Sequence, residues 1–427
     1  MDQVRTGSAR ASGIVRAART AGYESLRWVA SAAVLADGGL AWPLTALPGS
    51  PVADDLYDGT AGVLAAFTEA RLSGSTSFDD HARAGVSRLR RVAAAARHRG
   101  DVPDLSLYTG LSGIAWALAT WADDDSRPVA RSLVSDIARL AVSRPDTGVR
   151  DLLEGDAGVL LTLTSLGRDD ALQAASALAD RMVAGAHWPG GEPDWPAGPG
   201  IGAVRPNFSH GAAGIAYALA AASTRLARPD LLHVASSAGR RLIRLGDRPD
   251  GSLAVPYLVP PDPSEPEVSY GWCHGPTGTL RLFVLLDRLR PGQGWDRAAG
   301  AARRAVRLSG VPARLYPGFW DNLGQCCGTA GVGELALDRY QETADGRWLA
   351  WARELAADVL GRRIEDQAGV RWSHTEYRAS PPELEPAIGW MQGAAGIAAW
   401  LLRLARLHEQ GPTAPRLPWP DRPSARR

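Results

Sequence analysis

Two kinds of hydrophobic pattern alternate along the chain. One kind is apolar on almost every side of a helix, as in residues 215–220 and 397–402. The other repeats its apolar positions with the period of a helix and carries many arginines, which indicates a helix with one buried face. Seven segments are of this second kind: residues 14–36, 78–98, 127–142, 169–186, 230–246, 294–309 and 346–363.

The alternation of these two patterns predicts the architecture. A helix that is apolar all round needs neighbours on every side, whereas an amphipathic helix needs cover on one face only. The economical arrangement is two concentric rings with the apolar helices inside. No end segment has the polar outer face that caps an open solenoid. We therefore expect an all-α fold, an α/α toroid with a double ring of seven inner and seven outer helices.

Each apolar segment begins with the pattern Gly-x-x-Gly, which occurs seven times. The first glycines are Gly59, Gly110, Gly155, Gly211, Gly275, Gly328 and Gly393. Close packing of the first helical turn is one explanation of this pattern. The residue before each first glycine, however, is polar or reactive: Asp58, Thr109, Glu154, His210, His274, Cys327 and Gln392. If the helix starts converge on one end of a toroid, these side chains surround a common cavity, which favours a functional site.

The composition argues against several classes of function. A net charge of +1 gives no preference for nucleic acid or anionic lipid. All 47 basic residues are arginine, so the lysine of a phosphate-binding loop is absent. No apolar run approaches the roughly 20 residues of a membrane span, and the N-terminal stretch lacks the apolar core of a secretion signal. We expect a cytoplasmic protein with no membrane insertion and no nucleic-acid partner.

The three cysteines lie in two copies of the Gly-x-x-Gly motif. Cys273 stands directly before His274, and Cys326 and Cys327 are adjacent in the next copy. Neighbouring cysteines hardly form a relaxed disulfide, and an odd number does not suit a disulfide framework. A shared thiolate site for zinc is the leading hypothesis. Three ligands leave one position of zinc open, whereas His274 as a fourth ligand would close the site.

Several motifs together resemble the lanthionine synthetase C-like family, which includes the lantibiotic cyclases. They are the seven Gly-x-x-Gly patterns with Ser209-His210-Gly211, Trp272-Cys273-His274-Gly275 and Cys326-Cys327-Gly328. The resemblance extends from about Leu26 to Leu407 and implies an α/α toroid with one zinc ion, held by Cys273, Cys326 and Cys327. Position 327 departs from the commoner histidine. A three-cysteine set resembles that of some two-function lanthipeptide synthetases.

The resemblance also implies the reaction and its catalytic residues. A peptide cysteine, held as thiolate on zinc, adds to the β-carbon of dehydroalanine or dehydrobutyrine and closes a thioether ring. His210 matches the family's catalytic histidine, which would protonate the enolate, and Asp151 matches an aspartate beside it. His274 is a further candidate for this group. Without the resemblance, His210 and Asp151 would more often be helix caps.

One position departs from some relatives. Ser269 stands where some lantibiotic cyclases carry an arginine four residues before the first zinc cysteine. Any contribution of that arginine to enolate stabilisation would have to come from elsewhere. Arg205 and Arg281 are near the motifs in sequence, but the sequence alone assigns neither to this role.

The implied partners are a precursor peptide, with dehydrated Ser or Thr and free Cys, and a separate dehydratase. A chain of 427 residues leaves no space for a dehydratase domain of its own. Two alternatives stay open. One is a related enzyme that adds glutathione or another small thiol to dehydroamino acids, and the other is a non-catalytic, zinc-stabilised scaffold that binds a peptide.

Three segments rich in Pro, Gly and aromatic residues interrupt the alternation, at residues 188–207, 247–271 and 364–390. Since each precedes the start of an inner helix, they are expected at the cavity end, where they could shape a peptide groove. They could also be long connections only. We expect a single domain at residues 1–410 and an extended or disordered Pro/Arg-rich tail at residues 411–427.

Overall fold

The computed structural model describes residues 2–96, 103–198, 200–313, 322–375 and 380–422. The chain is mostly helical and divides into two compact units. The first unit comprises Met1–Arg91 and Gly310–Pro418, and the second comprises Val92–Ser309 and Trp419–Pro423. Every helix in the described ranges is too short or too polar to traverse a lipid bilayer.

The apolar segments form one set of helices, here called inner helices, and each begins at the residue after the first glycine of its motif. They are α2 (Thr60–Leu72), α4 (Leu111–Trp121), α6 (Asp156–Leu166), α8 (Ala212–Arg225), α10 (Pro276–Leu289), α12 (Thr329–Thr343) and α14 (Ala394–Gln410). The first nine residues of α6 and of α8 are all buried. These helices are buried on every side, as the segments that are apolar all round predict.

The arginine-rich segments form a second set, the outer helices. They are α1 (Asp2–Ser31), α3 (Asp79–Ala96), α5 (Ser126–Ser143), α7 (Asp169–Ala184), α9 (Pro229–Gly246), α11 (Trp295–Leu308) and α13 (Gly346–Gly361). In α9 the buried Leu231, Ala235 and Leu242 lie on one face, as expected for an amphipathic helix. The expected range 14–36 is corrected, because α1 ends at Ser31 and residues 34–36 are extended.

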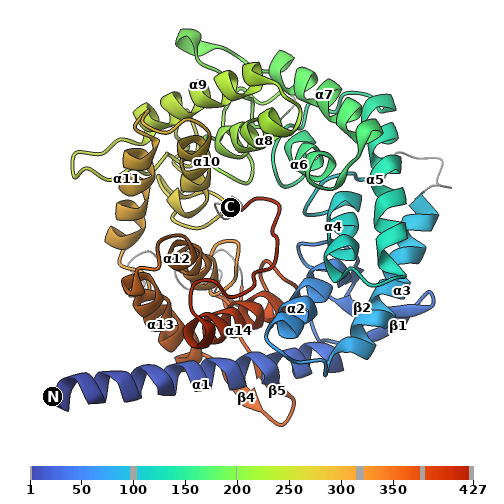
Figure 1. Ribbon diagram of the computed structural model, residues 1–427, viewed down its shortest axis with the longest axis vertical. Helices are drawn as coiled ribbons and strands as arrows, with labels where there is room; N and C mark the ends of the chain where they lie inside the picture. The colour runs from blue at the N-terminus through green and yellow to red at the C-terminus, as the bar shows by residue number, and fades with distance from the viewer. Residues whose placement is uncertain (1, 97–102, 199, 314–321, 376–379, 423–427) are drawn as a thin grey trace. The chain divides into compact units, whose positions relative to one another are not determined.

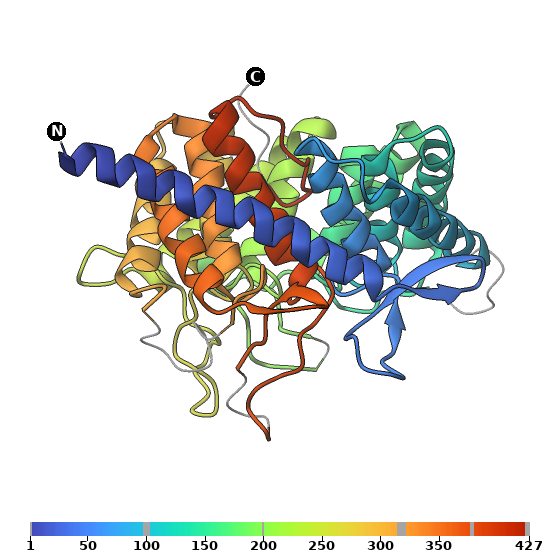
Figure 2. The same cartoon turned by 90° about the horizontal axis from the view of Figure 1, so that it is seen from below.

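Inner and outer helices form two layers within each unit. In the second unit, α4, α6, α8 and α10 follow one another in contact, and α5, α7, α9 and α11 each pack on the outside of the inner helix before them (Figure 1). In the first unit, α14 contacts α2 and α12, and α1 and α13 cover it from outside (Figures 1 and 2). Both units therefore have the α/α layering that the hydrophobic pattern predicts.

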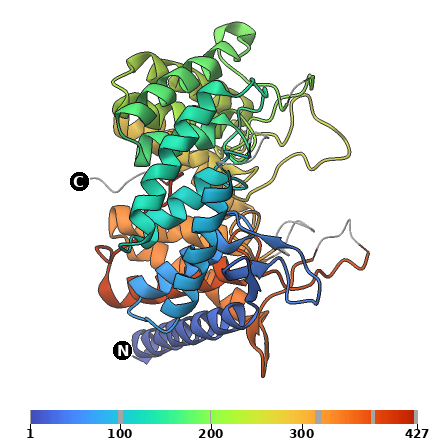
Figure 3. The same ribbon diagram turned by 90° about the vertical axis from the view of Figure 1, so that its right-hand side faces the viewer.

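Short strands occupy the loops that precede two inner helices of the first unit. Strands β1 (Val34–Ala36), β2 (Gly39–Pro43) and β3 (Val52–Ala53) pair antiparallel in that order, and β4 (Ile364–Asp366) pairs with β5 (Gly369–Arg371). Figure 2 shows them on the side where α14 begins. In the second unit, the segments before α8 and α10 likewise project where these helices begin (Figure 3).

The segment after α14 is held in place. In the first unit, Gln341 donates from Nε2 to the carbonyl oxygens of Pro412 and Ala414, at 3.2 and 2.9 Å. Trp419 and Asp421 are buried in the second unit. Residues 411–422 contain no helix or strand, and these contacts fix part of the segment, so disorder does not describe the residues named here. The extended tail stays a prediction. Residues 423–427 lie outside the described ranges, and the single-domain assignment of residues 1–410 stays a prediction.

Main-chain hydrogen bonds join the loops that directly precede successive inner helices, here called motif loops. In one bond that recurs, the residue two places before the first glycine donates its N–H to the carbonyl oxygen of the equivalent residue in the next repeat. The pairs are Tyr108–Leu153 (3.1 Å), Leu153–Ser209 (3.1 Å) and Ser209–Cys273 (2.9 Å) in the second unit, and Cys326–Met391 (3.0 Å) and Met391–Tyr57 (2.8 Å) in the first. These bonds set the register of neighbouring loops without using side chains.

The second glycine of a motif allows this close packing. A Cβ atom on Gly278 would lie 1.9 Å from the carbonyl oxygen of Trp272 and 2.6 Å from Cβ of Phe208. The first atom belongs to its own motif loop, and the second belongs to the loop of the preceding repeat. The small residues predicted to let helices approach one another therefore also let each helix approach its own loop.

Replacing Gly278 by alanine tests this packing. We expect Gly278→Ala to lower the free energy of unfolding by about 3 kcal/mol, because the new methyl group overlaps main-chain atoms that cannot move aside cheaply. Gly300→Ala on α11 is the control, since its Cβ would meet only a flexible Arg303 nitrogen at 3.8 Å; it should be neutral or slightly stabilising. Urea unfolding followed by circular dichroism measures both, and equal stabilities would contradict the packing argument.

Candidate active site and metal ligands

His210 and Asp151 form a hydrogen-bonded pair in the second unit. Nδ1 of His210 lies 3.0 Å from Oδ2 of Asp151. The other carboxylate oxygen accepts the main-chain N–H of Glu154 at 2.7 Å, and the N–H of His210 donates to Oδ1 of Asn207 at 3.3 Å. The His210 side chain is 24% exposed, whereas that of Asp151 is 10% exposed. The buried carboxylate therefore favours the tautomer with a proton on Nδ1 and leaves Nε2 available for chemistry.

His274 lies between His210 and Tyr257. Its ring centroid is 5.6 Å from that of His210 and 4.2 Å from that of Tyr257, with interplanar angles of 28° and 29°. The Tyr257 hydroxyl is 3.3 Å from Nε2 of His274. The carbonyl oxygen of Tyr257 accepts from Nδ2 of Asn207 at 3.4 Å. Tyr257 therefore belongs to the same cluster, although only its place in an aromatic-rich segment could have indicated this.

Cys273 is buried in the motif loop next to that of His210. Its carbonyl oxygen accepts three hydrogen bonds, from the N–H of Phe208 (3.1 Å) and from the N–H and Oγ of Ser209 (2.9 and 3.2 Å). These bonds involve the two residues directly before His210. The position of the Cys273 main chain is therefore tied to that of the catalytic candidate.

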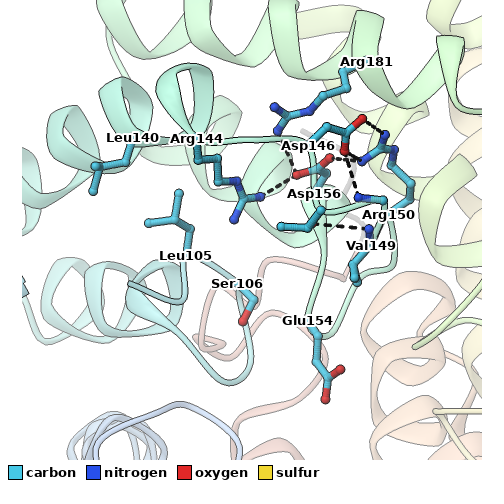
Figure 4. Close-up of polar contacts among 12 residues, drawn as sticks. Leu105, Ser106, Leu140, Arg144, Asp146, Val149, Arg150, Glu154, Asp156 and Arg181 are labelled. Carbon is cyan, nitrogen blue, oxygen red and sulfur yellow. Dashed lines mark hydrogen bonds and ion pairs between the residues drawn. The ribbon is translucent and has the colours of Figure 1, made fainter. Parts of the chain in front are cut away.

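A cluster of ion pairs supports the loop that carries Asp151. The buried carboxylate of Asp156, the first residue of α6, accepts hydrogen bonds from three guanidinium groups (Figure 4). They are those of Arg144, Arg150 and Arg181, at 2.6, 2.9 and 3.1 Å. Arg150 also binds both oxygens of Asp146 at 2.6 Å and thereby lowers the pKa of that carboxyl. Residues 146–150 are thus held against the start of α6, directly before Asp151.

Cys326 and Cys327 lie together in the first unit. Their Sγ atoms are 3.4 Å apart. Gln392, predicted to face the cavity, has Nε2 at 3.7 Å from Sγ of Cys327 and at 3.1 Å from the Tyr57 hydroxyl. Its Oε1 accepts from Nδ2 of Asn322 at 2.9 Å. The side-chain amide of Gln392 therefore lies beside the sulfur of Cys327.

His374 joins the segment before Cys326 to the neighbouring motif loop. Its Nδ1 accepts the N–H of Leu323 at 3.2 Å, and its Nε2 hydrogen-bonds the carbonyl oxygen of Gln392. Burial lowers the pKa of His374, so the neutral ring with a proton on Nε2 is the form that fits both bonds. Sequence reasoning missed this residue, because it lies in an irregular segment outside every motif.

The three cysteines are the candidate metal ligands. Cys326 and Cys327 lie side by side in the first unit, and Cys273 lies in the second. None of the three is in a disulfide. Because each can supply a thiolate, this donor set suits zinc, which binds cysteine sulfur in tetrahedral sites.

Ser269 and Arg281, which lie near the cysteine motif, are both buried and do not face an open site. Ser269, at the place of an arginine in some relatives, is buried. The guanidinium group of Arg281 is also buried and forms an ion pair with Asp421. Arg281 is therefore committed to a structural contact and does not take over the role of that arginine.

Comparison with known proteins identifies the family. The family model described as lanthionine synthetase C-like protein matches residues 50–415. The chain belongs to the lanthionine synthetase C-like family. This result confirms the resemblance that the cysteine and histidine motifs indicated. A search of curated proteins gave no match.

Solved structures show the fold of this lanthionine synthetase C-like protein. Nisin cyclase matches with a TM-score of 0.60 and 14% identity, over 88% of this chain and 90% of that chain. The predicted all-α toroid fold is confirmed by this likeness. An unsaturated glucuronyl hydrolase from Bacillus sp. GL1 (TM-score 0.49, 14% identity, 92% and 97% covered) and a cellobiose 2-epimerase from Spirochaeta thermophila DSM 6192 (0.47, 15%, 94% and 98%) are also similar.

Asp58, which precedes the first motif glycine, should make stability depend on pH. Burial, followed by the negative charge of Asp55, raises the pKa of the Asp58 carboxyl from 3.8 to about 6. In the unfolded chain the Asp58 carboxyl loses its proton near pH 4, whereas in the folded state it loses it near pH 6. This group favours the folded state fully below pH 4, and its contribution is lost as pH rises through about 6.

We expect Asp58→Asn to remove this loss. The variant should be more stable than the wild type by about 2 kcal/mol at pH 8 and of similar stability at pH 4. Asp80→Asn is the control, because the Asp80 side chain is 92% exposed. Urea unfolding at both pH values measures the difference, and a variant without greater stability at pH 8 would contradict the assignment.

Proposed function

We propose that the protein is a zinc-dependent lanthipeptide cyclase, which joins peptide cysteines to dehydroalanine or dehydrobutyrine residues in thioether rings. The observation that carries the proposal is the arrangement of Asp151, His210 and Cys273 on three successive motif loops of the second unit. The main-chain bonds between these loops hold a buried carboxylate, an oriented imidazole and a thiol in one frame. Membership of the lanthionine synthetase C-like family supports the same chemistry.

Cys273, Cys326 and Cys327 are the proposed zinc ligands. Cys273 and Cys326 each stand two places before the first glycine in successive repeats. Within each unit, equivalent residues of neighbouring repeats are joined by main-chain hydrogen bonds. The same register between these two repeats would bring the cysteines together, with Cys327 beside Cys326. When bound, zinc would keep the thiol of a peptide cysteine deprotonated and nucleophilic.

His210 is the proposed acid. The sulfur of the thiolate forms a bond to the β-carbon, and the π electrons of the C=C bond move to the adjacent carbonyl as an enolate. Nε2 of His210 then delivers a proton to the α-carbon. The proton that the thiol released replaces it, so ring closure consumes no net proton. Asp151 stabilises the imidazolium through Nδ1.

The proposed substrate is a precursor peptide that carries dehydrated Ser or Thr residues and free cysteines. Because the chemistry assigned to this chain removes no water, a separate dehydratase must act first. We place the reaction in the cytoplasm, where cysteine thiols stay reduced. Tyr257, which stacks on His274, and the segments before α8 and α10 are the proposed contact surface for the peptide.

Metal analysis tests the ligand set. We expect about one zinc ion per chain, and a loss of zinc affinity of roughly 100-fold or more in Cys273→Ala and in Cys326→Ala, because each removes a ligand. Cys327→His is the control, since histidine is also a zinc ligand and is the commoner residue at this place in the family. Elemental analysis and competition with a chelator give the readout. Unchanged zinc affinity in Cys273→Ala would reject the shared site.

Ring formation in a dehydrated peptide tests the catalytic pair. We expect His210→Ala to slow ring closure by about 10²–10⁴-fold with zinc retained, because the proton donor is lost. Asp151→Asn should lower the rate less, because it removes only the charge that stabilises the imidazolium. His233→Ala, an exposed histidine on α9, is the matched control. Thiol alkylation followed by mass spectrometry counts the rings.

The same assay separates the alternatives. Adding glutathione to a dehydrated peptide without cysteines tests transfer of a small thiol. Enzyme-dependent glutathione adducts without enzyme-dependent rings would favour the glutathione-adding activity. Equal ring formation with and without the protein would leave only the scaffold.

A further inference from the structure

A buried aspartate near the C-terminus sits in the core of the second unit. Asp421 is 0% exposed. Its Oδ2 accepts hydrogen bonds from the Tyr108 hydroxyl and from Nε1 of Trp272, both at 2.8 Å, and its Oδ1 accepts from Arg281. These donors come from two motif loops and from α10. One side chain from the end of the chain therefore connects three elements that are far apart in sequence.

Trp419 strengthens the same contact. Its Nε1 donates to the Tyr108 hydroxyl at 2.9 Å, and its ring lies edge-on to Trp116 of α4, with centroids 4.5 Å apart. Tyr108 thus accepts from Trp419 and donates to Asp421. Burial, followed by the charge of Asp421, raises the pKa of Tyr108, so its hydroxyl keeps the proton that it donates. Residues 419–421 are here called the C-terminal anchor.

The C-terminal anchor also contributes an ion pair, between Asp421 and Arg281. The Arg281 side chain is 8% exposed, and its guanidinium group lies over the ring of Phe208 at 5.8 Å from the centroid. A buried cation is costly unless an anion compensates it. Asp421 supplies a negative charge there, so the segment contributes a charge partner to the core and not only apolar surface.

Trp272 carries the effect of the anchor towards the site. Trp272 directly precedes Cys273, and its ring packs against Tyr108 and Phe208, at centroid distances of 5.1 and 5.9 Å. Phe208 and Ser209 in turn donate their N–H groups to the Cys273 carbonyl oxygen, just before His210. The hydrogen bond from Trp272 to Asp421 therefore fixes the Trp272 ring, and the motif loops of Tyr108 and Phe208 pack against that ring.

We propose that Asp421 is a positioning residue for Cys273 and His210, and that the C-terminal anchor is an integral part of the catalytic unit. The role of the positioned residues rests on the cyclase function proposed above. Asp421 itself does not reach the reacting atoms; it acts through Trp272. Loss of its charge leaves Arg281 uncompensated and releases the Trp272 ring, and Cys273 then becomes more accessible.

Alkylation of the cysteines in the native protein tests the proposal directly. Cys273 belongs to the second unit, whereas Cys326 and Cys327 belong to the first and serve as internal references. We expect Asp421→Asn, and a chain ending at Pro418, to raise the alkylation rate of Cys273 about tenfold, as local opening does. After chelator treatment, the rates of Cys326 and Cys327 should change much less. Mass spectrometry of peptides from the protein, as purified and after chelator treatment, gives all three rates.

Two control variants separate positioning from general loss of stability. Leu178→Ala removes a buried side chain on the outer helix α7, away from the anchor. It should destabilise the protein without selective exposure of Cys273. A chain ending at Pro423 keeps the anchor and should keep the wild-type rates. In the chelator-treated protein, where no shared metal couples the three thiols, equal acceleration of all three cysteines, or an unchanged Cys273 rate in Asp421→Asn, would overturn the proposal.

Kinetics of ring closure provide a second readout. Asp421→Asn should lower kcat about tenfold with little change in KM, because the groups are displaced and the peptide surface is kept. A wild-type protein that neither binds zinc nor closes rings would remove the cyclase function. The alkylation pattern would still decide whether Asp421 positions Cys273.

Discussion

The structure depends on the close approach of main chain to main chain at the start of each inner helix. The second motif glycine lets the helix lie against the carbonyl oxygens of its own loop, as Gly278 does with Trp272. The residue two places before the first glycine then bonds to its equivalent in the next repeat. Any side chain at the glycine would separate these surfaces, so the packing and the register have one common cause.

The site uses this register to orient groups that would otherwise be mobile. His210 follows Ser209, whose N–H and hydroxyl both bond the Cys273 carbonyl oxygen. Asp151 follows Arg150, which two carboxylates hold in place. The imidazole of His210 lies 3.0 Å from the carboxylate of Asp151. Main-chain hydrogen bonds fix the loop of His210, and buried ion pairs fix the loop of Asp151. Such support reduces the reorganisation that a proton transfer requires.

The regular parts of the molecule could be predicted from the sequence, and its single contacts could not. The glycine pattern placed every inner helix start, because the same steric demand recurs seven times. The two cysteine motifs identified the candidate ligands, and the family resemblance identified His210 and Asp151. Tyr257, His374 and Asp421 belong to irregular segments, where no period marks a buried residue. Their partners are distant in sequence, so only the folded chain brings them together.

The backbone origin of the register has a consequence for how such a protein can change. The equivalent positions of the motif loops carry Tyr57, Tyr108, Leu153, Ser209, Cys273, Cys326 and Met391. Since their amide and carbonyl groups set the register, that register tolerates different side chains at these positions, although Tyr108 and Ser209 add side-chain hydrogen bonds of their own. The side chain at such a position can therefore be a thiol, a hydroxyl or an aromatic ring on the same backbone. A reactive group could be introduced in another repeat by substitution, without a change of the backbone.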